Sequence, residues 1–388
     1  RDILLVSSLY DNYLFEEDGR LYELIRSEFQ TLNLSHPPEM MHVSSGGEAL
    51  ELLQSDAEHF DLIITTLHIE DMHVIKFAQS VRDAGFDIPM VLLAYDNRER
   101  KDLVTNYDIS MFDKIFTWQG DYHLLIGIIK YIEDLRNVEN DTLTSGVQSI
   151  ILLEDSVQFY SVYLPLIYTE ILKQSQRLIS EGVNLTHRFL RMRARPKILL
   201  CTTFEEALTY YEKYQDFVLG IITDVNIIKG NAKETEAGIE FARLVKAQHD
   251  DIPILIQSSN AEFSTRAREI GASFLLKSSP RLLHDLREFM LNNFGFGDFS
   301  FRLNDGREVS RATNLRELEE QLKTVPDESI LFHARRNHFS NWLKARAEFW
   351  LAQQLRPKRP EDFESVGQLR ELLINSLQKY REIQQRGA

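Results

Sequence analysis

The chain has 388 residues, of which 43 % are hydrophobic and 27 % charged, and it contains a single cysteine, Cys201. This length is enough for two or three domains with buried cores. One cysteine excludes a disulfide framework and fits a reducing cytoplasm. No apolar run approaches the roughly 20 residues that a membrane-spanning helix needs. We therefore expect a cytoplasmic protein and, because the sequence does not begin with methionine, part of a longer chain.

The formal net charge of −15 at pH 7 is unevenly distributed along the chain. Residues 299–388 hold 16 basic and 13 acidic side chains, whereas residues 1–298 hold 28 basic and 46 acidic ones. Affinity for nucleic acid depends largely on basic side chains that neutralise phosphates. Such an acidic front part argues against a nucleic-acid-binding protein.

The first part of the chain alternates apolar runs with amphipathic segments. The runs D-I-L-L-V-S-S, F-D-L-I-I-T-T and I-P-M-V-L-L-A-Y lack strict alternation, which is typical of strands buried on both faces of a parallel sheet. Helices are expected where apolar residues recur at spacings of three and four, in Asn12–Thr31, from Gly46, from His73 and from Tyr122. This order predicts a doubly wound α/β domain.

The same pattern occurs a second time. The runs S-I-I-L-L-E-D, F-V-L-G-I-I-T-D-V-N and I-P-I-L-I-Q-S-S resemble the three strands of the first copy in order. Further helices are expected in T-F-E-E-A-L, A-G-I-E-F-A and P-R-L-L-H-D. We predict one α/β unit at residues 1–138 and another at 149–297, joined by a polar, turn-rich linker at 139–148.

Polar side chains end the predicted strands of the second copy. Glu154 and Asp155 follow S-I-I-L-L, and Asp224 follows F-V-L-G-I-I-T. In parallel sheets, ligands bind just beyond the carboxyl ends of the strands. Three acids there repel one another unless they share a cation, and Mg²⁺ prefers such oxygen ligands. Two other strands end in Ser258 and Lys277, a hydroxyl and an ammonium that can hold phosphoryl oxygens.

The order E-D, D, S, K at successive strand ends resembles the receiver domain of two-component response regulators. The resemblance implies two flavodoxin-like (βα)5 domains with five-stranded parallel sheets. It also implies that a histidine kinase or phosphotransfer protein donates a phosphoryl group to one aspartate in a reaction that requires Mg²⁺.

The resemblance assigns roles to individual residues. Asp224 corresponds to the phosphoacceptor, Asp155 to a direct metal ligand, and Glu154 to a ligand that acts directly or through water. Asn226 corresponds to the residue whose backbone carbonyl binds the metal, and Ser258 to the switch hydroxyl. Phe274 corresponds to the aromatic switch position and Lys277 to the lysine that pairs with the phosphoryl group.

Two features depart from the family pattern. The spacing from Gly271 to Lys277 is one residue shorter than usual, which bears on how far Lys277 reaches. The loop after Asp224, N-I-I-K-G-N-A-K-E-T-E, is longer than usual and indicates an altered surface over the acceptor.

The first copy lacks the residues that carry this chemistry. Ser7 and Ser8 stand at the positions of the acidic pair, Thr66 at the phosphoacceptor and Ala94 at the switch hydroxyl, while residues 116–118 replace the lysine region. Asp61 lies at the wrong end of its strand. We therefore interpret residues 1–138 as a degenerate pseudo-receiver that serves for contacts.

About forty residues separate Asp155 from the next strand, P-K-I-L-L-C, which predicts a long or broken helix with Pro165 as a kink. A basic cluster ends this insert. Its members are Arg188, Arg191, Arg193, Arg195 and Lys197. Two interpretations stay open: a docking patch for an acidic partner, or a solvated helix end favoured by the helix dipole.

Residues 298–388 are predicted to be mainly helical. Asn314 should cap a helix, N-H-F-S-N-W-L-K-A-R-A-E-F-W-L-A-Q-Q-L should form another with an aromatic stripe, and Q-L-R-E-L-L-I-N-S-L a last one. The histidines of H-A-R-R-N-H, His333 and His338, lack the spacing of a zinc motif, and we expect a structural role for them.

The stretch F-H-A-R-R-N-H-F-S-N-W-L-K-A-R and the pattern L-R-P-x-x-P-x-D-F resemble the segment before the ATP-binding domain of phosphoenolpyruvate synthase and pyruvate phosphate dikinase-like proteins. The resemblance implies a regulatory front end of such an enzyme. The last helix would lead into the missing domain or pair with a second chain as a homodimer.

Three functions remain open. The favoured one is a phosphorelay regulatory module, not itself an enzyme, in which phosphorylation of Asp224 alters domain packing. The second is a scaffold that is not phosphorylated and positions a dikinase-like enzyme. The third, a Mg²⁺-dependent phosphohydrolase, would need a substrate pocket that the sequence does not indicate.

Overall fold

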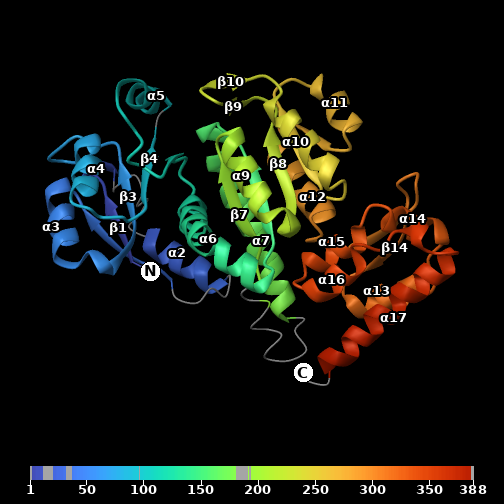
Figure 1. Cartoon of the computed structure of the whole chain (residues 1–388). Helices are drawn as coiled ribbons and strands as arrows, with labels where there is room; N and C mark the ends of the chain where they lie inside the picture. The colour runs from blue at the N-terminus through green and yellow to red at the C-terminus, as the bar shows by residue number, and fades with distance from the viewer. Residues whose placement is uncertain are drawn as a thin grey trace. The chain divides into compact units, whose positions relative to one another are not determined.

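The computed structural model describes residues 2–11, 21–31, 37–95, 97–180, 191 and 194–385 (Figure 1). They form two compact units, one of residues 1–133 and 156–168 and the other of residues 134–155 and 169–388. The division falls within helices α6 (His123–Ser145) and α7 (Val157–Ser180). No helix in the described part of the chain is long and apolar enough to span a membrane.

The first unit contains a parallel sheet with the strand order β2-β1-β3-β4-β5. The strands are β1 (Asp2–Val6), β2 (Glu39–Val43), β3 (Phe60–Thr66), β4 (Met90–Ala94) and β5 (Lys114–Thr117). The helices around it are α2 (Leu21–Thr31), α3 (Gly46–Asp56), α4 (Val74–Asp83) and α5 (Asn97–Asn106), with the first turns of α6 and α7. This is the flavodoxin-like order, so the predicted fold class is confirmed for the first copy. Residues 12–20 of the expected first helix lie outside the described residues.

The start of α7 packs against strand β5 of the first unit. The backbone N–H of Thr117 donates to Ser161 Oγ (2.9 Å), and the Tyr160 hydroxyl donates to the carbonyl of Ile115 (2.5 Å). Tyr160 also packs edge-on against Phe116, with ring centroids 5.4 Å apart. The turns of α7 therefore satisfy polar groups of an edge strand that would otherwise stay unpaired.

The second unit contains a sheet of the same kind, with all neighbouring strands parallel and the order β7-β6-β8-β11-β12. The strands are β6 (Ser149–Leu153), β7 (Lys197–Cys201), β8 (Val218–Asp224), β11 (Ile254–Ser258) and β12 (Ser273–Leu276). Helices α9 (Phe204–Tyr214), α10 (Ala237–Gln248) and α11 (Phe263–Glu269) lie between them, and α12 (Leu282–Asn293) follows β12. A two-stranded hairpin, β9 (Ile227–Lys229) and β10 (Ala232–Glu234), is inserted after β8.

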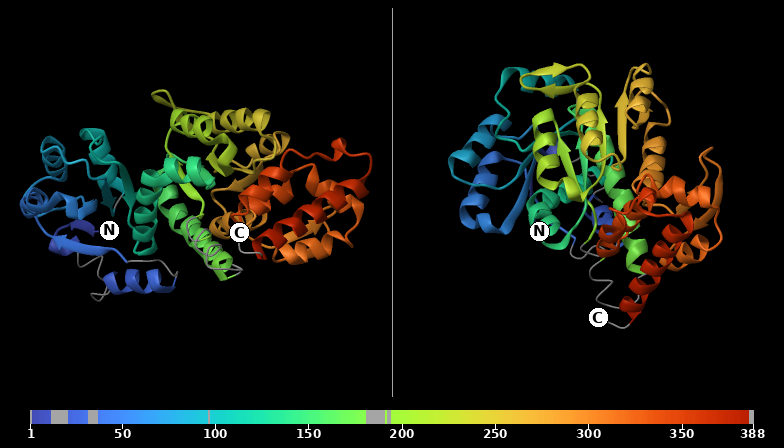
Figure 2. Two further views of the ribbon diagram at one scale, coloured as in Figure 1. Left: turned by 60° about the horizontal axis from the view of Figure 1, so that its bottom comes forward. Right: turned by 45° about the vertical axis from the view of Figure 1, so that its right-hand side comes forward.

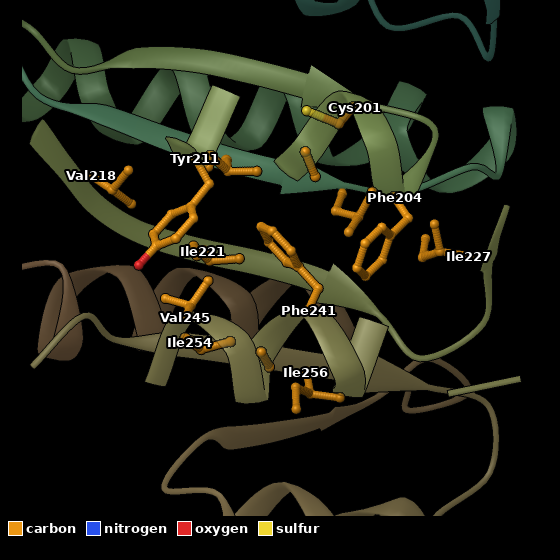
Figure 3. Close-up of a cluster of buried hydrophobic side chains, with 14 of the residues drawn as sticks. Cys201, Phe204, Tyr211, Val218, Ile221, Ile227, Phe241, Val245, Ile254 and Ile256 are labelled. Carbon is orange, nitrogen blue, oxygen red and sulfur yellow. The ribbon is translucent and has the colours of Figure 1, made fainter. Parts of the chain in front are cut away.

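Apolar side chains on one face of this sheet form its core with α9 and α10 (Figure 3). Tyr211 and Phe241 project from these helices over Ile221 of the central strand, and their rings meet edge-on with centroids 6.1 Å apart. On the other face, Phe294 follows α12 and lies over Gly220, where an added Cβ would meet the ring at 2.0 Å. Both faces of β8 are thus closed, which explains its uninterrupted apolar run.

The expected linker at 139–148 is helical over most of its length, because α6 continues through Ser145. Asp134 of α6 forms an ion pair with Arg195 (2.7 Å) and accepts a hydrogen bond from the backbone N–H of Ile198 (2.9 Å). Lys197 forms an ion pair with Asp141 of the same helix (2.7 Å). These bonds hold the polar second half of α6 in place as a helix.

The same bonds correct both interpretations of the basic cluster. Arg191, Arg195 and Lys197 are each at least nine-tenths buried, and Arg191 donates to Glu348 at 2.6 Å. They are neither an exposed docking patch nor a solvated helix end, because acidic groups within the unit neutralise them. Arg188 and Arg193 lie outside the described residues.

The C-terminal part begins with a hairpin that was not expected and continues in helices. Its elements are β13 (Phe299–Arg302), β14 (Glu308–Ala312), α13 (Leu315–Leu322), α14 (Asp327–Ala334), α15 (His338–Lys344), α16 (Phe349–Leu355) and α17 (Val366–Gln385). Asn314 caps α13 as predicted, since its side chain accepts from Glu317 N–H. The single helix expected from Asn337 to Leu355 is wrong, because the chain breaks at Ala347 (φ 60°) and buries Glu348 between Arg191 and Tyr380.

Arg346 joins this part to the segment that follows α12. It is 1 % exposed and donates to the carbonyls of Gly295 (2.8 Å), Gly297 (3.1 Å) and Thr313 (3.3 Å). Its guanidinium lies 3.6 Å from the ring centroid of Trp342. A second contact is the ion pair between Arg356 and Asp251 (3.1 Å), next to the start of β11.

We expect Gly238→Ala to destabilise the protein by about 3 kcal/mol, because the new Cβ would overlap the Asp224 carbonyl at 1.7 Å and backbone cannot yield there cheaply. Gly367→Ala is the matched control, since Gly367 is also the second residue of its helix but meets only Ser365 Oγ at 3.6 Å. The control should change the unfolding free energy by about 1 kcal/mol or less. Chemical denaturation measures both, and equal effects would contradict the expected overlap.

We expect Arg346→Met to lower the unfolding free energy by about 3 kcal/mol, because three partly buried carbonyls lose a charged donor. Arg316→Met is the control: Arg316 is 73 % exposed and pairs only with Glu320, and its loss should cost about 0.5 kcal/mol or less. Urea denaturation of the two variants tests the difference.

Candidate functional site

The parallel sheet of the second unit brings the predicted site residues to one edge. Glu154 directly follows β6, Asp224 ends β8, Ser258 ends β11 and Lys277 directly follows β12. Because β6, β8, β11 and β12 are successive neighbours and all run the same way, their carboxyl ends meet. The sequence prediction that these residues converge is confirmed.

Glu154, Asp155 and Asp224 form what we call the acidic site. One carboxylate oxygen from each lies within 4.8 Å of the others, and no second group of this kind occurs among the residues that the structure describes. Glu154 is fully buried and Asp224 is 7 % exposed. Three carboxylates held this close and this deep in the protein need cations nearby.

Lys277 supplies one of these cations. Its Nζ lies 2.6 Å from Glu154 Oε2 and 3.2 Å from Asp224 Oδ2, and its side chain is 4 % exposed. The short spacing after Gly271 therefore does not keep Lys277 from the acceptor. Gln257, whose role the sequence did not indicate, donates from Nε2 to the same Glu154 oxygen at 3.3 Å.

Burial raises the pKa of Asp224 above its ordinary value. The Lys277 ammonium and the backbone N–H of Val225, which donates to Asp224 Oδ1 at 2.9 Å, act in the opposite direction but do not cancel the loss of solvation. The Asp224 carboxylate is thus held in a position where a further positive charge would stabilise it.

A second cation reaches the acidic site from the β9–β10 hairpin. Lys233 Nζ lies 2.8 Å from Asp155 Oδ1. The sequence indicated a longer loop at this point but not the lysine contact. The Gly-Asn pair at 230–231 between two short runs is a hairpin signal that would have predicted the turn.

The other predicted residues surround this centre. Ser258 is 4 % exposed, and its Oγ accepts from the N–H of Asn260 (3.1 Å). Phe274 is half-buried in β12 and packs against the core under α10. Asn226 lies two residues beyond Asp224 and its side chain accepts from Glu236 N–H at 3.3 Å. Their switch and metal-binding roles stay predictions.

The acidic site fits a small hard cation by its donor set. Mg²⁺ takes oxygen ligands at about 2.1 Å in an octahedron, so two ligands on opposite sides of the ion are about 4.2 Å apart. Oxygens within 4.8 Å of one another can reach that geometry through small side-chain rotations. Glu154, Asp155 and Asp224 are therefore residues that could hold Mg²⁺.

The first sheet has neutral residues at the same places. Thr66 ends β3 and donates from Oγ1 to the His68 carbonyl (2.8 Å), Ala94 ends β4, and Ser7 follows β1 with its Oγ 3.0 Å from His42 Nε2. None of these strand ends carries a carboxylate, as predicted.

The two histidines of the C-terminal part are separate from the acidic site. His333 Nε2 accepts from the N–H of Arg302 (2.8 Å), and its Nδ1 lies 2.9 Å from Nδ1 of His338. Burial lowers the pKa of His333 to about 2 and that of His338 to about 4. Both are neutral near pH 7 and pack as structural groups.

No family model and no curated protein matches this chain. Among solved structures, one whose title reads "probable two-component system response regulator/GGDEF domain protein" matches with 12 % identity and a TM-score of 0.32, covering 74 % of this chain and 96 % of that one. Response regulator TrrA from Thermotoga maritima, in complex with Mg²⁺ and BeF, matches with 20 % identity and a TM-score of 0.26, covering 34 % of this chain and 98 % of that one. Response regulator Rcp1 in its Mn²⁺-bound form matches with 19 % identity and a TM-score of 0.23, covering 37 % and 97 %. Similarity at this level assigns neither family nor function to this chain.

We expect Asp224→Asn to stabilise the metal-free protein at pH 7, on the order of 1 kcal/mol, because it removes one of three crowded carboxylates. The pKa of Asp224 is higher in the folded protein than in the unfolded chain, so the unfolded chain loses the carboxyl proton at a lower pH. The parent therefore loses stability as the pH rises above about 4. The advantage of the variant should therefore grow from pH 4 towards pH 7. Thermal unfolding in chelator measures it, with Asp305→Asn, a 63 % exposed aspartate, as control. A variant less stable than the parent at pH 7 would contradict the expected repulsion.

Proposed function

We propose that this chain is a phosphorelay regulatory module in which Asp224 accepts a phosphoryl group from a histidine kinase or phosphotransfer protein. The observation that carries the proposal is the convergence of Glu154, Asp155 and Asp224 with Lys277 at the carboxyl edge of one sheet. The buried ammonium of Lys277 lies beside both Glu154 and Asp224, where it could pair with an oxygen of a phosphoryl group carried by Asp224.

The chemistry asks for little covalent work from the protein. An oxygen of Asp224 would attack phosphorus while the bond from phosphorus to the donor nitrogen breaks, which gives an acyl phosphate. Bound Mg²⁺ would neutralise charge on the transferred group and orient it, held by Glu154, Asp155 and Asp224 and, as the resemblance implies, by the Asn226 carbonyl. Lys277 would pair with one phosphoryl oxygen and the Ser258 hydroxyl would donate to another.

The product would change the local charge balance. The phosphoryl group of the acyl phosphate would carry up to two negative charges beside Ser258 and Lys277 while the Asp224 carboxylate loses its own charge, and Lys277 would be drawn from Glu154 towards the phosphoryl group. Phe274, on the strand that directly precedes Lys277, would respond as the aromatic switch. The chain would thus be a regulatory protein rather than an enzyme.

The remaining parts receive roles that follow from this proposal. The first sheet, which lacks carboxylates at its strand ends, would be a pseudo-receiver that makes contacts. Residues 298–388 would connect the receiver to an output, such as the dikinase-like enzyme that their sequence resembles or a second copy of the chain. We propose that the protein acts in the cytoplasm.

A second candidate function is a scaffold that is never phosphorylated. The ion pairs that Lys277 and Lys233 already make with the acidic site favour it, because they reduce the need for a metal. In that case the acidic site would be a structural ion network.

The test is the intact mass of the chain after incubation with acetyl phosphate and Mg²⁺. We expect one added phosphoryl group in the parent and none without Mg²⁺ or in Asp224→Asn. Asp305→Asn, which changes an exposed aspartate in the turn between β13 and β14, should still gain the group.

Two results would contradict the proposal. An adduct that persists in Asp224→Asn would place the phosphoryl group elsewhere. No adduct at short times, together with no binding of beryllofluoride, would support the scaffold instead.

A further inference from the structure

The β9–β10 hairpin packs against the second unit, and its residue Lys233 forms an ion pair with Asp155. Ile227 is fully buried in the core that α9 and α10 share. Gly230 N–H donates to Glu205 (2.9 Å), and Lys229 pairs with Glu240 of α10 at 2.6 Å. The first strand of the hairpin is therefore fixed on both neighbouring helices.

The second strand is held less firmly. Ala232, Lys233 and Glu234 are all exposed, and the backbone of this strand pairs with β9. The Lys233 side chain is 53 % exposed, whereas the Asp155 side chain that it contacts is only 6 % exposed. The lysine thus contacts a carboxylate that is buried in this arrangement, through a side chain that is itself half-exposed.

We propose that Lys233 is an internal competitor for the divalent cation: its ammonium occupies Asp155 in the metal-free protein and must leave before Mg²⁺ binds there. This inference rests on the proposed function, because it assumes that Asp155 is a metal ligand.

Charge and geometry both support the competition. Asp155 Oδ1 lies 2.8 Å from Lys233 Nζ, so a metal ion bound to that oxygen would lie close to the ammonium. A +1 group repels a divalent ion and is strongly screened only at distances beyond about 10 Å at 0.1 M salt. One carboxylate oxygen cannot hold both at full strength.

The competition would couple the metal to the surface above the site. Release of Lys233 frees β10 from the acidic site while β9 stays fixed by Lys229 and Gly230. The exposed strand of the hairpin would therefore differ between the metal-free and metal-bound protein. A kinase or phosphotransfer partner that approaches Asp224 would meet this strand.

The experiment is a calorimetric titration of the metal-free chain with Mg²⁺ at low ionic strength, for the parent and three variants. Lys233→Met should bind Mg²⁺ roughly two- to fivefold more tightly than the parent, the range expected when an exposed ion pair is removed. Lys233→Arg keeps the charge and should stay within about twofold of the parent.

Lys229→Met is the matched control, because it removes the same charge from the same hairpin but breaks a pair with Glu240 rather than with Asp155. It should leave the Mg²⁺ affinity near that of the parent. Thermal unfolding of each variant verifies that it is folded.

The outcomes separate this inference from the proposed function. Equal Mg²⁺ affinity in the parent, Lys233→Met and Lys229→Met would overturn the competition while metal binding stands. Weaker binding in Lys233→Met would also overturn it and make the lysine an aid to the metal. No Mg²⁺ binding in any of the four chains would overturn the proposed function itself.

Discussion

The mutual repulsion of three carboxylates at one sheet edge is the constraint around which the second unit is arranged. Glu154 is fully buried and therefore cannot rely on water to solvate its charge. Lys277 and Lys233 bring two positive charges to three carboxylates, which leaves the site with one uncompensated negative charge. A site with this deficit is poised to gain a cation, and the gain changes which lysine stays in contact with which carboxylate.

The C-terminal part is attached far from this edge along the strands. Asp251, which pairs with Arg356, precedes β11, whereas Ser258 ends it. Figure 2 likewise shows the β9–β10 hairpin (yellow) beyond one end of the sheet and the C-terminal helices (orange to red) towards the other. An event at Asp224 would therefore act on residues 298–388 through strands and helices of the second unit rather than by contact. Phe274 and Arg302 line one surface hollow beside α12.

The sequence predicted most of the site because strand ends are local features. An apolar run that stops at a charged residue identifies both the strand and the edge, so Glu154, Asp155, Asp224, Ser258 and Lys277 could be grouped before their distances were known. What it did not predict depends on contacts between distant segments. The sequence alone suggests that Arg191 and Arg195 are surface residues, whereas in the structure they are buried in ion pairs with Glu348 and Asp134. The polar stretch after Val138 stays helical because of such pairs. Lys233 meets Asp155 across 78 residues, which no local pattern shows.

The first sheet shows that this topology does not need charged strand ends. It has the strand order of the second sheet, and it places Ser7, Thr66 and Ala94 where the second sheet has Glu154, Asp224 and Ser258. Its buried hydroxyls are satisfied by a histidine ring and a backbone carbonyl, and the buried carboxylate of Asp11, five residues beyond β1, lies 3.7 Å from His68. Buried carboxylates cost stability unless something compensates them. Since this topology forms without carboxylates at the strand ends, the fold alone does not account for the acids of the second sheet, whereas the proposed phosphoryl group with its metal carries charges that match both the acids and Lys277.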